Sequence, residues 1–282
     1  MVHPIGSPVL ATHPGGISQG TRAQLERLHR ELPGAFDVEQ ASRVLSVSPD
    51  QTRRLLAYLA RRGWLARVRR GLYVPVPLDA RQSGQWLEDT WVVADHAFSP
   101  CYIGGWSACE HWGLTEQLFR TLLVVTARKV HERDVEIQGS RFRLTVRPSS
   151  KLFGTVPVWR GQVRVAVSDP SRTIIDVLDD PSLGGGIHHV ADVLHTYLGS
   201  EHRDDRLLVE YGDHLGNRAV FKRLGYLLEQ SKADAEPLIS ECLIRKSAGL
   251  ALLDPSVRAP GRIRRRWGIR VNVTLGTPGG DW

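Results

Sequence analysis

Seven arginines lie within eighteen consecutive positions that contain no carboxylate. A guanidinium keeps its charge at neutral pH and presents a planar fork of N–H donors, which matches phosphate oxygens and the guanine edge. Residues 1–80 hold eleven Arg, no Lys and six acidic residues, so a charge of +5 out of +7 falls in the first third of the chain. This pattern predicts binding to a polyanion, with duplex DNA as the first candidate. The seven residues are Arg53, Arg54, Arg61, Arg62, Arg67, Arg69 and Arg70.

The spacing of these arginines predicts a helix that presents some of them. Ser48 is a suitable N-cap, Pro49 suits the first helical position, and Gln51 completes a capping box and joins the candidate DNA contacts. Gly63 ends the helix. At 100° per residue the apolar side chains share one face and the arginines lie on or near the opposite one. The inner face holds Thr52, Leu55, Leu56 and Leu59, and the outer face holds Arg53, Arg54, Ala57 and Arg61.

The flanking segments complete a winged helix-turn-helix. Asp37 caps a helix over 38–45, residues 46–48 form the turn, and a helix over 21–32 adds to the core. Residues 64–68 and 72–74 read as two strands, with Arg69-Arg70-Gly71 reversing the chain between them. A winged helix used for protein contact, or a merely solvated basic face, is the alternative to DNA binding.

The length of 282 residues predicts two domains and an α+β fold, in which the N-terminal winged helix precedes a larger mixed α/β domain. No stretch is apolar enough for a membrane span, so we expect a cytoplasmic protein. The three cysteines suit buried, reduced thiols. The expected boundaries are a disordered leader at 1–20, the winged helix at 21–78, a linker at 79–85, the second domain at 86–275 and a tail at 276–282.

The second domain contains segments with the two-residue periodicity of strands and segments with the helical periodicity of about 3.6 residues. Their order predicts a mixed sheet followed by a run of helices. Strands are expected at 101–103, 122–125, 142–146, 163–167 and 269–273. Helices are expected at 86–98, 169–179, 187–198, 204–215 and 218–230, with glycines at 184–186 and Gly216-Asn217 as breaks.

Several groups in this domain suggest chemistry, and each has a simpler interpretation. Residues 105–109 miss a nucleophile elbow by one glycine, and 183–186 lack the Lys of a phosphate loop, which favours a loop before a helix. Glu110, Asp169 and Asp176 could hold Mg²⁺ in a nuclease, although an N-cap role explains Asp169. Three histidines have no familiar zinc spacing. We therefore predict no catalytic residue, metal site or cofactor. The histidines are His188, His189 and His195.

A second basic cluster lies near the C-terminus and is closed by Trp267. It could extend a DNA footprint or contact RNA or an acidic partner, with a solvated loop as the alternative. One Trp beside a strand is more often core than a stacking platform, and the same holds for Trp106 and Trp112. The cluster consists of Arg258, Arg262, Arg264, Arg265 and Arg266.

Four sequence blocks resemble the AbiE-type abortive-infection antitoxin family, with a similarity that extends from about residue 20 to 275. The family usually has Glu where this chain has Ser171, a departure expected to cost a surface salt bridge. The blocks are 102–108 (YIGGWSA), 111–117 (HWGLTEQ), 167–176 (VSDPSRTIID) and 222–229 (KRLGYLLE).

The resemblance implies a transcriptional autorepressor and antitoxin. Its winged helix would bind inverted repeats upstream of its own operon, and its larger domain would neutralise a nucleotidyltransferase toxin encoded alongside, without requiring a stable toxin complex. Two alternatives belong to other classes: a metal-dependent nuclease with a DNA-reading head, and a ligand-sensing transcription factor without a toxin partner. Metal-dependent cleavage would favour the first, and a small molecule that alters operator affinity would favour the second.

Overall fold

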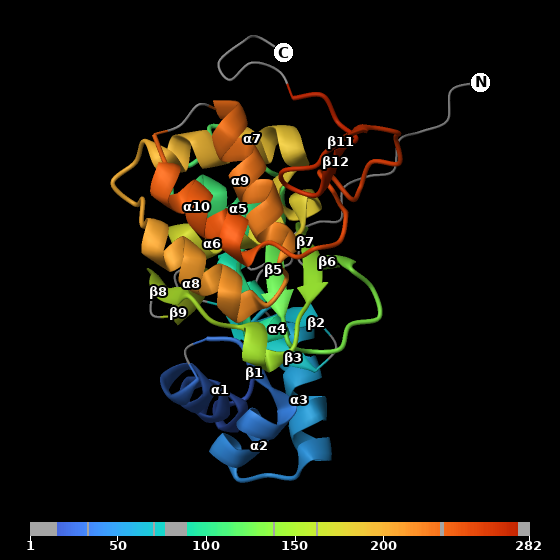
Figure 1. Ribbon diagram of the computed structural model, residues 1–282. Helices are drawn as coiled ribbons and strands as arrows, with labels where there is room; N and C mark the ends of the chain where they lie inside the picture. Colours follow the sequence, from blue (N-terminus) through green and yellow to red (C-terminus); the bar gives the residue numbers. More distant parts are fainter. Residues whose placement is uncertain are drawn as a thin grey trace, which may run out of the picture. The chain divides into compact units, whose positions relative to one another are not determined.

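The computed structural model describes residues 16–32, 34–69, 71–76, 89–137, 139–161, 163–231 and 234–275 (Figure 1). These residues divide into two compact units. The first contains the chain up to Ala97 together with Glu136–Ser140 and Trp159–Arg164, and the second contains the rest. The predicted linker and C-terminal tail lie outside the described residues, so the predicted domain boundaries stay predictions.

The first unit has the winged helix-turn-helix order that the sequence predicts. Three helices are followed by a hairpin, and a short strand before the second helix completes a sheet of order β1-β3-β2. The sequence analysis did not foresee that short strand, and β2 begins one residue later than expected. The elements are α1 (Gln19–Glu31), β1 (Phe36–Asp37), α2 (Val38–Leu45), α3 (Pro49–Arg61), β2 (Leu65–Arg69), β3 (Leu72–Pro75) and α4 (Thr90–Phe98).

Two helix starts in this unit differ from the predicted ones. The α1 helix begins at Gln19 rather than at residue 21, because the Ser18 hydroxyl accepts from the Thr21 N–H. The last two residues of the predicted disordered leader are therefore helical. The α4 helix begins at Thr90 rather than at residue 86, and Asp89 accepts a hydrogen bond from the Trp91 N–H.

Six strands form the large sheet, in the order β6-β7-β5-β4-β9-β8. It is mixed, as predicted, because β5 runs parallel to β7 and antiparallel to β4, while β4 runs parallel to β9. The edge strands β6 and β8 are additions to the predicted set. The strands are β4 (Cys101–Ile103), β5 (Thr121–Thr126), β6 (Asp134–Ile137), β7 (Ser140–Val146), β8 (Thr155–Arg160) and β9 (Val163–Ser168), with the short 3-10 turn η1 (Ser149–Lys151) after β7.

The helices of the second unit follow the sheet in sequence, as predicted, and a small sheet of order β10-β12-β11 follows them. The last strand ends at Val271, two residues earlier than expected, and α9 starts and ends one residue later. The elements are α5 (Gly105–His111), α6 (Pro170–Asp179), η2 (Pro181–Gly184), α7 (Ile187–Leu198), α8 (Asp205–Leu215), α9 (Ala219–Ser231), α10 (Glu236–Arg245), β10 (Ala251–Leu252), β11 (Arg262–Arg264) and β12 (Ile269–Val271).

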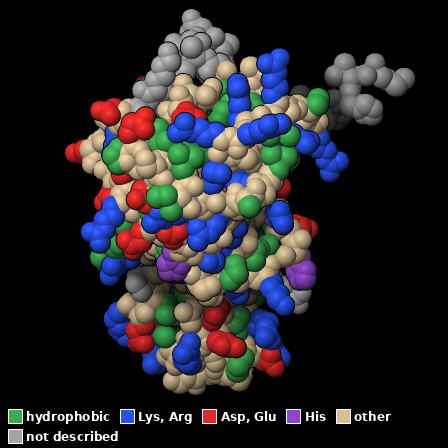
Figure 2. Space-filling model, viewed as in Figure 1, with side chains coloured by type: hydrophobic (Ala, Val, Ile, Leu, Met, Phe, Trp, Pro, Cys, Tyr) green, Lys and Arg blue, Asp and Glu red, His purple; other side chains and the backbone are tan. Residues whose placement is uncertain are grey.

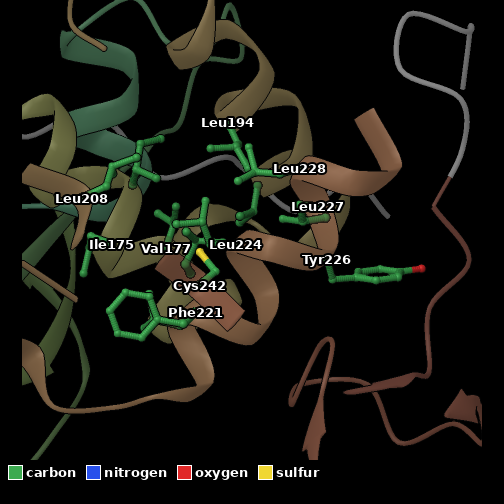
Figure 3. Close-up of a cluster of buried hydrophobic side chains, with 14 of the residues drawn as sticks. Ile175, Val177, Leu194, Leu208, Phe221, Leu224, Tyr226, Leu227, Leu228 and Cys242 are labelled. Carbon is green, nitrogen blue, oxygen red and sulfur yellow. The ribbon is translucent and has the colours of Figure 1, made fainter. Parts of the chain in front are cut away.

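The helices pack around α6 and α9, whose apolar side chains form the core shown in Figure 3. Ile175, Phe221 and Leu224 are fully buried there, and the sulfur of Cys242 lies among them. Burial raises the pKa of Cys242 and of Cys109 to about 12, so both remain thiols. Cys101 is only half-buried, which corrects the prediction that all three cysteines are buried.

A buried charged cluster joins α6 to the sheet. Arg172 Nη2 and Asp176 Oδ1 lie 2.9 Å apart one helical turn from each other, and the Tyr102 hydroxyl donates to Asp176 Oδ2 at 2.8 Å. The Arg172 guanidinium also lies 3.9 Å from the centre of the Phe153 ring. Burial raises the pKa of Asp176, and the positive charge of Arg172 opposes that rise. Each charge thereby compensates the other in the protein interior.

Ser171, on the same helix, is buried, and its hydroxyl lies 2.8 Å from that of Tyr197. The expectation of a lost surface salt bridge at this position is therefore wrong. The side chain faces the helices behind α6, not solvent. Among the described residues, no helix is long and apolar enough to cross a membrane.

Candidate nucleic-acid interface

The α3 helix separates an apolar face from a basic one, as predicted. The Ser48 hydroxyl accepts a hydrogen bond from the Gln51 N–H, and Pro49 occupies the first turn. The Gln51 side chain does not return a bond to the Ser48 backbone, so the predicted capping box is only half formed. Thr52, Leu56 and Leu59 are fully buried. The outward side chains are all exposed, so packing on one face leaves a row of guanidinium groups on the other. The exposed set is Gln51, Arg53, Arg54, Arg61 and Arg62.

The turn before α3 fixes how that helix is presented. Ser46 ends α2 in the left-handed conformation, with a φ of 57°. The Ser42 hydroxyl donates to the Val47 carbonyl oxygen at 2.6 Å, which ties the turn back to α2. At the other end of α2, Asp37 and Gln40 form a complete capping box. Both helices are thereby held at their ends by local hydrogen bonds.

The arginines of α3 differ in how far they are already engaged. Arg53 pairs with Asp50 at 2.5 Å, and its neighbour Arg54 has no acidic partner within the described part of the chain. Arg61 likewise has none there. The Arg62 guanidinium lies 5.5 Å from the centre of the Tyr58 ring, a cation–π geometry that the arginine pattern alone did not reveal. Arg54 and Arg61, about two turns apart, are therefore the cations of α3 most available to an external anion.

The wing is a two-stranded hairpin with a bulge. The β2 and β3 strands pair antiparallel, and their register shifts between Arg67 and Arg69. Arg67 is exposed and Gly71 has a φ of 82°, as the turn requires. Arg69 extends β2, although the turn was predicted to include it. Arg70 and the side chain of Arg69 lie outside the described residues, so their predicted contacts stay predictions.

The C-terminal basic cluster lies on the hairpin of β11 and β12, over which Figure 2 shows several blue side chains. All five arginines are exposed. Arg266 pairs with Glu229 at 2.8 Å, and the Trp267 indole donates to the same carboxylate. Trp267 is 1% exposed and packs on Gly225, so it serves as core and cannot stack on a base. The other four arginines have no acidic partner among the described residues: Arg258, Arg262, Arg264 and Arg265.

The acidic and nucleophilic candidates of the second domain have structural partners. Asp169 caps α6 by accepting from the Arg172 N–H, as predicted, and also accepts from the Tyr211 hydroxyl. Asp176 is committed to the buried pair, whereas Glu110 is exposed. Ser107 is buried and accepts from the Leu123 N–H. Within the described chain, no group of three His, Cys, Asp or Glu side chains could hold a metal ion.

Hydrogen bonds hold His189 and the two tryptophan candidates in place, whereas His195 is exposed. His189 bonds to the Thr115 hydroxyl at 2.7 Å and to the Gly184 carbonyl at 2.5 Å, which joins α7 to the loop before it. The Trp106 indole donates to the Thr121 carbonyl, and the Trp112 indole to the Ser168 carbonyl. The glycine-rich loop is the predicted break before a helix.

Comparison with known proteins supports the interpretation of the first unit. Residues 23–76 match the family described as transcriptional regulator, AbiEi antitoxin. This match confirms the predicted resemblance over the winged helix-turn-helix. The four sequence blocks between residues 102 and 229 lie outside the matched segment, and there the resemblance stays a prediction. No curated protein matches the sequence of this chain.

The fold as a whole is similar to a solved structure, the crystal structure of RV2827C protein from Mycobacterium tuberculosis. The TM-score is 0.61, the sequence identity is 14%, and the alignment covers 92% of this chain and 93% of the other. At this identity the similarity concerns the fold alone.

Proposed function

We propose that this chain is a DNA-binding transcriptional repressor of its own promoter and an antitoxin that counteracts a nucleotidyltransferase toxin. The observation that carries the first part is the row of exposed arginines on α3, held outward by a fully buried opposite face. The second helix of a helix-turn-helix, here α3, is the recognition helix. It enters the major groove, where Arg side chains bind guanine. A promoter-binding role places the protein in the cytoplasm.

The wing and the C-terminal hairpin extend this proposal. Arg67 and its neighbours in the wing would contact phosphates, because a hairpin of this size lies across the backbone or reaches the minor groove. The unpaired arginines of the C-terminal cluster would add a further contact to nucleic acid. Neither role needs a catalytic residue or a cofactor.

The antitoxin role is proposed for the second unit. Its support is the family match of the first unit, which describes regulators that are also antitoxins, together with the sequence blocks at 102–229. The proposed pairing is functional and does not require a stable complex with the toxin.

The experiment measures both activities of the full chain. Purified protein is titrated into the DNA upstream of its own reading frame, with a scrambled fragment of equal length as the control, and a reporter on that promoter is measured in cells. We expect tighter binding to the inverted repeats than to the scrambled fragment, and repression of the reporter. For neutralisation, the chain is co-expressed with the proposed nucleotidyltransferase toxin and growth is scored. Equal affinity for both fragments would refute specific recognition, and loss of growth on co-expression would refute neutralisation.

A further inference from the structure

The second unit contains a cavity of about 340 Å³ that the DNA-binding surface does not use. Its walls come from α5, from the end of β7 and from the loop around η2. A volume of this size suits a small organic ligand rather than a polymer, since such pockets typically measure roughly 300–1,000 Å³. The lining residues used below are Trp106, Arg133, Arg143, Arg147, Asp180 and Ser182.

Three guanidinium groups line this cavity against one carboxylate. Arg143 Nε pairs with Asp134 at 2.5 Å and Arg147 pairs with Asp179, so each of these two is held by an acid. Arg133 is exposed and has no acidic partner within the described ranges. Arg133 is therefore the lining guanidinium that no carboxylate of the described residues engages.

The single lining carboxylate is already committed. Asp180 Oδ1 accepts from the Ser182 N–H at 3.1 Å and from its hydroxyl at 2.7 Å, which shapes the η2 turn. Asp180 keeps its negative charge, but the lining holds three guanidinium groups to this one carboxylate, so the lining itself favours a negatively charged ligand. Guanidinium groups bind phosphate oxygens through paired, charge-assisted hydrogen bonds.

A rigid aromatic ring forms the remaining wall. Trp106 stacks on Phe119 with ring centres 5.4 Å apart and planes inclined by 16°, and its indole N–H is held by the Thr121 carbonyl. Gly105, just before it, has a φ of 51° and packs closely against the Leu183 backbone, where a side chain would not fit. A ring fixed in this way offers a flat ligand a contact surface without further ordering.

We propose that this cavity binds a nucleoside phosphate, with the phosphates on the arginines and the base against Trp106. The proposal is independent of the DNA contacts of α3, which belong to the other unit. It commits to a free mononucleotide rather than a strand, because the cavity holds about one nucleotide.

The test is calorimetric titration of the full chain with ATP and with CTP. The informative variant is Arg133→Ala, since that side chain makes no ion pair whose loss could disturb the fold. Arg206→Ala is the matched control, because it removes the same charge from the exposed surface of α8, outside the cavity. Circular dichroism confirms that both variants are folded.

We expect micromolar binding of at least one nucleotide, weakened about tenfold or more in Arg133→Ala, as the loss of a hydrogen bond between charged groups implies. The Arg206→Ala protein should bind like the wild type. Absence of binding at millimolar nucleotide, or equal weakening in both variants, would overturn the proposal. Tripolyphosphate binding as tightly as ATP would overturn the role of Trp106, and much tighter binding of a single-stranded oligonucleotide would replace the mononucleotide with a strand.

Discussion

Replacing Arg54 with alanine tests the recognition surface most directly. Its side chain is exposed on α3, and no acid of the described chain engages it, so it reaches DNA without first breaking an ion pair. A bidentate contact with guanine contributes roughly 1–3 kcal/mol of discrimination. The expected loss of promoter affinity is therefore roughly 5- to 160-fold, and preference at one operator position should relax.

Arg53 provides an internal comparison. It is paired with Asp50 at 2.5 Å, with 61% of the Arg53 side chain and 77% of the Asp50 side chain exposed. An exposed pair of this kind contributes about 0–1 kcal/mol, and that contribution is lost when the guanidinium turns to DNA. We therefore expect a smaller effect from Arg53→Ala than from Arg54→Ala.

The assay is a binding titration on the promoter fragment at one fixed salt concentration, because affinity for DNA depends steeply on salt. Arg27→Ala is the matched control, since it removes the same charge from α1 of the same unit. Wild-type affinity in the Arg54→Ala protein, or an equal loss in the Arg27→Ala protein, would refute base recognition by this side chain.

Three further predictions concern stability, each measured by chemical or thermal unfolding. A Cβ at Gly225 would lie 2.1 Å from the buried Trp267 ring, so Gly225→Ala should destabilise the second unit by about 1–3 kcal/mol. An unchanged midpoint of unfolding would contradict this packing. Asp176→Asn should cost about 3–5 kcal/mol by leaving Arg172 buried without its partner, and replacing both with apolar residues should cost less. Burial lowers the pKa of His29, so the unfolded chain binds protons more readily and stability should fall as pH drops below about 6.5. The variant His29→Gln should flatten that dependence, and an unchanged pH profile would remove His29 as its source.

The first unit was largely predictable because its signals are local. Asp37 and Ser48 cap the second and third helices, and apolar residues recur at helical spacing behind them. The hairpin followed from a glycine between two short apolar runs. The sequence did not indicate β1, because a strand of two residues shows no periodicity and this one pairs with the distant β3.

The second unit was less predictable where structure depends on distant partners. The α5 helix has Gly104 at its N-cap position and therefore no side-chain cap. Four of its seven residues are buried, so it lacks the polar face that marks a helix. The β8 strand contains Pro157, which argues against a strand unless it lies at an edge, as it does here. The predicted DNA-contact arginines fall within eighteen positions of the sequence. The arginines of the cavity are residues 133, 143 and 147, opposite a loop near residue 180, and no spacing rule joins them.

Deleting residues 1–80 tests the division of labour between the units. The deletion removes α1 to β3 and with them the arginines of α3, so promoter binding should be lost. The remaining fragment keeps the whole apolar core around α6 and α9. Because that core is built within the second unit, the fragment should fold.

Neutralisation should then survive at least in part, if the second unit carries it. The fragment is co-expressed with the proposed nucleotidyltransferase toxin and growth is scored, with circular dichroism to confirm folding. Full-length Arg54→Ala is the matched control, because it should weaken operator binding without removing any element. Protection by both proteins would separate neutralisation from repression. Protection by Arg54→Ala alone would mean that the winged helix itself contacts the toxin or its target. If neither protein protects at matched expression, DNA binding and neutralisation are one activity, and the proposed division of labour is wrong.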